Sequence, residues 1–129
     1  MRALELGARS AELPPAVSVL SGLPSLDLSR SLDLTTAGCG PLAALTGLRE
    51  LALHDTRVME VPASIQALTG LTRLSLNSFV RSWHGLRHLR ALALQLLKDE
   101  SEPAELPQAL RSELAAQLAA GLAITYFRR

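Results

Sequence analysis

Residues 48–70 read LRELALHDTRVMEVPASIQALTG, and Leu71 begins the same pattern again with LTRLSL. The first six residues have the form L-x-x-L-x-L, whose L-x-L part alternates with a period of two and predicts a short strand with one buried face. Pro62, Ile65, Leu68 and Leu71 then follow at every third position, which predicts a 3₁₀ or irregular helical turn. Such a unit buries little alone, so its repetition predicts a stack of units.

The same pattern extends over nearly the whole chain, which predicts a single domain of residues 1–129. We call each L-x-x-L-x-L segment a head. Successive heads are 18 to 30 residues apart, so the outer units are less regular than the middle ones. The heads lie near residues 1–6, 23–28, 48–53, 71–76, 89–94 and 119–124.

This repeat resembles the leucine-rich repeat family in its typical form, L-x-x-L-x-L-x-x-N-x-L-x-x-L-P-x-x-I-x-x-L-x-x. The resemblance implies an α/β fold: a leucine-rich repeat solenoid with short parallel strands on the concave face and irregular or helical return segments. The chain departs from the family at the Asn position. Ser and Thr there can still bond the turn backbone, whereas Phe and Leu cannot, so the fourth and fifth units are expected to bend differently. That position holds Arg9, Ser31, Thr56, Phe79 and Leu97.

The two ends of the chain differ from the middle. Residues 106–129 change period and predict a capping segment, with a helix that starts at Pro107 and ends at Gly121, followed by a last strand at 122–127. An all-helical Leu/Ala bundle is the alternative, and it fits only this region. Met1, Leu4 and Leu6 begin directly in a head without a cap, so self-association through this uncapped edge is expected.

The composition excludes several classes of protein. Of 129 residues, 29 are Leu and 19 are Ala, while the net charge is only +1. A nearly neutral chain argues against a nucleic-acid partner, because such proteins concentrate basic residues on one face. No apolar run is long enough for a membrane span and no Sec signal peptide is recognisable, which predicts a soluble protein, cytoplasmic or exported by another route. The Ala/Arg/Leu bias resembles that of bacterial proteins from GC-rich genomes.

No catalytic, cofactor or metal site is expected from the sequence. His84 and His88 have the spacing of a helical pair, but no further ligand joins them. His54 and Asp55 are adjacent in the chain, which does not make a catalytic triad. Cys39, the single cysteine, occupies the Pro position of a return segment and is expected to be a buried, inert thiol. The chain is therefore not expected to be an enzyme.

The resemblance implies instead a protein–protein interaction module. In this family the variable positions of the heads face the concave surface, which predicts a protein or peptide partner over the middle strands. Glu50 is expected beside Arg73, where the two side chains can satisfy one another. Two alternatives remain open: the substrate-recognition part of a larger bacterial effector or ubiquitin-ligase-type protein, and a degenerate structural repeat fragment. The predicted partner-binding residues are Arg49, His54, Asp55, Arg73 and Asn77.

Overall fold

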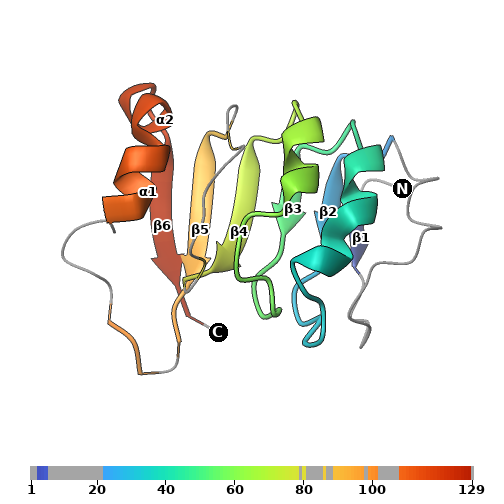
Figure 1. Ribbon diagram of the computed structural model, residues 1–129, viewed down its shortest axis with the longest axis horizontal. Helices are drawn as coiled ribbons and strands as arrows, with labels where there is room; N and C mark the ends of the chain where they lie inside the picture. The colour runs from blue at the N-terminus through green and yellow to red at the C-terminus, as the bar shows by residue number, and fades with distance from the viewer. Residues whose placement is uncertain are drawn as a thin grey trace.

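The protein has a mixed α/β architecture built on one open parallel sheet (Figure 1). The computed structural model describes residues 3–5, 22–78, 80, 86, 89–97, 99–101 and 108–128. The predictions made for Met1, Leu6, Phe79, His84, His88 and Pro107 lie outside these residues. The six strands are β1 (Ala3–Glu5), β2 (Ser25–Asp27), β3 (Glu50–Ala52), β4 (Arg73–Asn77), β5 (Ala91–Gln95) and β6 (Ala123–Phe127).

Each strand pairs with the next one along the chain, in the order β1-β2-β3-β4-β5-β6. β1, β2 and β3 fall within predicted heads and β6 within the predicted last strand, whereas β4 and β5 each extend one residue beyond their heads, to Asn77 and Gln95. The fourth residue of each head lies at the same level of the sheet, so that Leu26, Leu51, Leu74 and Leu92 form one continuous row. Leu4 and Ile124 continue the row at its two ends. Parallel strands need a crossover segment between them, and the return segments supply it.

The return segments that the structure describes cover one face of the sheet (Figure 1). Two of them contain 3₁₀ helices, η2 (Ala37–Ala44) and η3 (Ala63–Ala67), as the period of three predicts. Two short α-helices, α1 (Gln108–Glu113) and α2 (Ala115–Ala119), cover the same face beside β6. The Leu, Ile and Val side chains of the strands and return segments meet in a single core cluster between these layers.

The C-terminal region contains both the helix and the strand that the change of period predicts. Leu110 and Leu114, four residues apart, are fully buried against the core. The helix is interrupted at Leu114, where the backbone leaves helical geometry (φ −111°, ψ 20°), although the Leu118 N–H still donates to the Leu114 carbonyl at 2.8 Å. Gly121 follows with φ 104°, a conformation that favours glycine, and the chain turns there into β6.

Thr56 shows how the chain manages without the family's Asn. Its hydroxyl donates to the Leu53 carbonyl at 2.6 Å and accepts the Val58 N–H at 3.3 Å. The side chain is buried, so these bonds satisfy polar groups that would otherwise be desolvated without a partner. The expectation that a Thr at this position bonds the turn backbone is confirmed.

Candidate binding face

The face of the sheet opposite the helices carries the side chains of alternate strand residues. We call it the open face. A groove of about 350 Å³ runs across it from β2 to β6. Two rows of side chains line the groove, one residue before and one residue after the central leucine of β2 to β5 or Ile124 of β6. The rows consist of Ser25, Glu50, Arg73, Ala91 and Ala123, and of Asp27, Ala52, Ser75, Ala93 and Thr125.

Glu50 and Arg73 form one side of the groove. They pair directly in the register of β3 and β4, and Nη1 of Arg73 lies 3.6 Å from Oε1 of Glu50. The expectation that these two residues lie beside one another is confirmed. Both side chains are more than half exposed, so the pair contributes only about 0–1 kcal/mol to stability. The charges remain accessible to a ligand in the groove.

His54 and Phe127 lie next to the groove lining, where the strands end. Their rings meet edge to face, with centroids 4.9 Å apart and an interplanar angle of 86°. His54 also shares a hydrogen bond of 2.8 Å between its Nδ1 and the hydroxyl of Ser75. The imidazole is therefore held from two directions, by the Phe127 ring and by Ser75, which lines the groove.

A buried amide network lies at the same level as these rings. Asn77 and Gln95 pair in the register of β4 and β5, and both side chains are buried, with 3% and 6% exposed. Their carbonyl oxygens both accept the N–H of Asp55, at 2.8 and 3.0 Å, and the Asn77 amide donates to the Thr56 carbonyl at 2.9 Å. Asp55 has a positive φ of 57°, so the network stabilises a left-handed turn after β3.

The structure brings together some of the predicted partner-binding residues and separates others. Arg73 lines the groove, and His54 is bonded to the lining residue Ser75. Asp55 lies in the turn that follows His54. Asn77 is buried and its side chain holds that turn, so it presents no surface to a partner. Arg49 directly precedes β3 and does not line the groove. Its backbone N–H donates to the Pro24 carbonyl at 2.7 Å.

Sequence reasoning missed Phe127 and the structural role of the two amides. Alignment of the heads contains the signal that could have found them. Asn77, Gln95 and Phe127 are the last residues of β4, β5 and β6, and they lie at one level of the sheet. Asp27, a variable position of the second head, was not among the predicted partner-binding residues. It lines the groove, and its Oδ1 accepts both the N–H and the hydroxyl of Ser29, at 2.9 and 2.5 Å.

The environment of His54 lowers its pKa below the ordinary value of 6.5. Burial is the main cause, because it disfavours the charged imidazolium. The carboxylates of Asp27 and Asp55 act in the opposite direction, and the guanidinium of Arg30 acts with burial. His54 is therefore neutral at neutral pH.

This shift predicts a pH-dependent contribution of His54 to stability. At pH 7 the imidazole is mainly neutral in both the folded and the unfolded chain, so its titration contributes little to the free energy of unfolding. As the pH falls through 6.5, the unfolded chain binds the proton more readily than the folded one, and the free energy of unfolding falls. Urea unfolding of the wild type and of His54→Gln at pH 7, 6 and 5 should show the wild type losing stability relative to the variant. A difference in unfolding free energy between the two proteins that stays constant with pH would contradict the lowered pKa of His54. The other histidines do not affect this difference, because both proteins contain them.

The open face carries no recognisable catalytic arrangement in the part of the chain that the structure describes. The serine beside His54 is Ser75, which lies within the paired part of β4, where the sheet uses the backbone groups. No backbone N–H pair is left there to stabilise an oxyanion, as nucleophilic serine chemistry requires. Burial raises the pKa of the Cys39 thiol to about 12, so this thiol is protonated and unreactive. Among the described residues, no three His, Cys, Asp or Glu side chains gather into a group that could hold a metal ion.

The described helices are all too short or too polar to cross a membrane. No protein-family model matches the chain, and no curated protein matches it.

Proposed function

We propose that this protein is a leucine-rich repeat solenoid that acts as a protein-interaction module and binds a protein or peptide segment across its open face, without chemistry of its own. The continuous leucine row supports the repeat assignment, because one residue of each unit occupies one level of the sheet. Neighbouring return segments also bond to one another: the Ser64 hydroxyl donates to the Cys39 carbonyl at 2.9 Å, and the Thr36 hydroxyl oxygen accepts the Met59 N–H at 3.0 Å. Such unit-to-unit contacts are typical of stacked repeats.

The observation that carries the binding proposal is the groove itself. It crosses β2 to β6, and polar and small side chains line it. Packing of the core does not require these residue types, because the side chains lie on the face opposite the core. The lining mixes charged residues with alanines, so it combines hydrogen-bonding groups with room for a ligand backbone. Strands hold these side chains in place, and a rigid surface lowers the ordering cost of binding.

A groove-filling variant tests this proposal. Ala93 lies in the floor between Ser75 and Thr125, and Ala93→Trp would place an indole where the ligand should lie. Peptides of eight random residues, displayed on phage and selected on the full chain, serve as the probe. We expect the selected peptides to bind the wild type and to bind Ala93→Trp at least a hundredfold more weakly, by fluorescence polarisation. The melting temperature should change little, since the new ring enters an open groove.

Ala67→Trp is the matched control, because Ala67 is an exposed residue of η3 on the opposite face. It should leave peptide binding unchanged. Peptides that bind both Trp variants equally well would place binding outside the groove and contradict the proposal. The recognition part of a larger ligase-type protein would use the same face and respond in the same way, whereas a degenerate repeat fragment would yield no groove-dependent peptide.

A further inference from the structure

The lining of the groove is electrostatically uneven along its length. Asp27 of β2 and Glu50 of β3 lie at one end of the lining, and Arg73 of β4 lies next to them. Two carboxylates therefore face one guanidinium at this end. The lining over β5 and β6 is uncharged and small, and consists of Ala91, Ala93, Ala123 and Thr125.

The two carboxylates differ in their partners. Glu50 is paired with Arg73 at 3.6 Å. Asp27 accepts hydrogen bonds from Ser29 at one oxygen only and forms no ion pair with any described residue. The side chain is half-buried, so its charge is less screened than that of a fully exposed carboxylate. Asp27 thus places a negative charge without an ion-pair partner among the described residues at the β2 end of the groove.

The dimensions of the groove suit an extended chain that crosses the strands. The two lining rows, represented on β3 by Glu50 and Ala52, are two residues apart along the chain, which corresponds to about 7 Å at 3.3 Å per residue. The distance from β2 to β6 spans four inter-strand spacings of about 4.8 Å, or roughly 19 Å. An extended peptide covers that distance with about six residues.

We infer that the groove binds an extended segment of about six residues, with a lysine or arginine side chain at the Asp27 end and small side chains over β5 and β6. This inference rests on the proposed function and specifies its ligand. The basic side chain forms a charge-assisted hydrogen bond with Oδ2 of Asp27, the oxygen that Ser29 does not use, and such a bond is stronger than one between neutral groups. The alanine floor lets the ligand backbone approach closely, and larger ligand side chains would clash there.

The test uses the phage-selected peptides described above and a charge-removing variant. Asp27→Asn keeps an oxygen that can accept the Ser29 hydrogen bonds, so the turn is retained while the charge is lost. We expect the groove-dependent peptides to share a Lys or Arg followed by Gly, Ala or Ser, and to bind Asp27→Asn at least tenfold more weakly than the wild type. Replacing the basic residue of the peptide by norleucine should cost the same factor in the wild type and almost nothing in Asp27→Asn.

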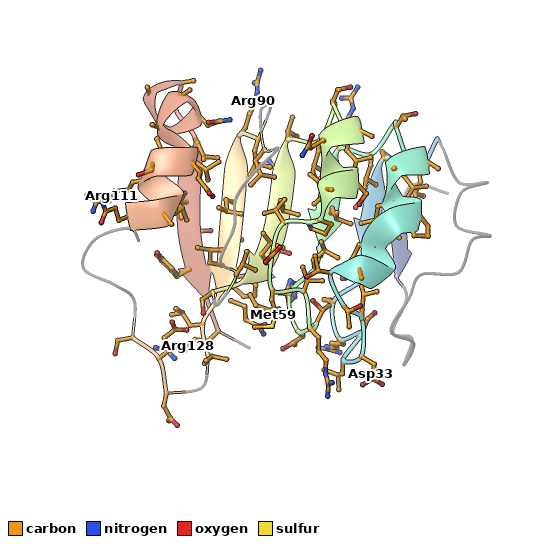
Figure 2. All side chains as sticks on the ribbon, in the orientation of Figure 1. Asp33, Met59, Arg90, Arg111 and Arg128 are labelled. Atoms are coloured by element: carbon orange, nitrogen blue, oxygen red, sulfur yellow. The ribbon has the colours of Figure 1, made fainter. Side chains whose placement is uncertain are left out.

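Asp33→Asn is the matched control. Asp33 is exposed at the end of the molecule where the strands finish, outside the groove lining (Figure 2), and its replacement should leave affinity unchanged. Groove-dependent peptides that are acidic, or that bind Asp27→Asn as well as the wild type, would overturn this inference and leave the proposed function intact. A selection that yields no peptide sensitive to Ala93→Trp would overturn both.

Discussion

Replacing Leu51 or Leu74 by Ala should lower the free energy of unfolding by roughly 2–5 kcal/mol. Both side chains are almost completely buried, with 3% and 2% exposed, and they lie side by side in the register of β3 and β4. Each also has a leucine at its level on the other side, Leu26 for Leu51 and Leu92 for Leu74. The cavity left by either substitution is lined by packed side chains from three units, so little of it can collapse.

The loss is a large share of the total stability, because domains of this kind are stable by only about 5–15 kcal/mol. Urea unfolding followed by far-ultraviolet circular dichroism measures it. Leu32→Ala is the control, since Leu32 is 48% exposed and its truncation should change stability by less than about 0.5 kcal/mol. If Leu51→Ala and Leu74→Ala melted like the wild type, these leucines could not belong to the stacked core.

The double variant carries further information about stacking. Residues in direct contact do not act independently, and their combined effect departs from the sum of the single effects by about 0.5–3 kcal/mol. Leu51 and Leu74 are neighbours, so their effects should couple. Leu26 and Leu92 share the row but have two strands between them, so their effects should add. This contrast tests the strand order directly.

The positions of the strands were predictable because one signal repeats. An L-x-L pattern fixes which face of a strand is buried, and the common position of the leucines within each head fixes the register between strands. The 3₁₀ helices η2 and η3 follow similarly from a period of three. The interruption at Leu114 was not predictable, because apolar spacing of four continues through it and only the local backbone departs from helical geometry.

The candidate site was less predictable than the fold. Alternation along β4 places Asn77 on the open face, and on that basis it was expected to meet a partner. The structure buries its side chain, which bonds to the turn after β3 through the Asp55 N–H and the Thr56 carbonyl and lies beside Gln95 of β5. Periodicity within one strand does not show what the neighbouring units place above it. Comparison of the aligned heads would have shown the two amides in adjacent units.

The role assigned to Asn77 leads to the second prediction with a large effect. Asn77→Asp preserves the shape of the side chain, and one oxygen can still accept the Asp55 N–H. The second oxygen, however, replaces the amide that donates to the Thr56 carbonyl. At neutral pH the substitution buries a carboxylate against a carbonyl oxygen, and an uncompensated buried charge costs roughly 3–5 kcal/mol. The exposed Gln66→Glu, on η3, should cost less than about 0.5 kcal/mol.

The penalty of Asn77→Asp should also depend on pH in a defined direction. Burial raises the pKa of the introduced carboxyl in the folded state above its unfolded value of about 3.9. Below pH 3.9 the group is protonated in both states, and its O–H can donate to the Thr56 carbonyl as the amide does. As the pH rises through the folded pKa, the unfolded chain loses its proton more easily, and the variant loses stability relative to the wild type. Urea unfolding of both proteins between pH 4 and pH 8 should therefore show a small difference at pH 4 that grows towards neutrality. A small difference at every pH would mean that Asn77 is accessible to water, and its side chain would then be available to a partner on the open face.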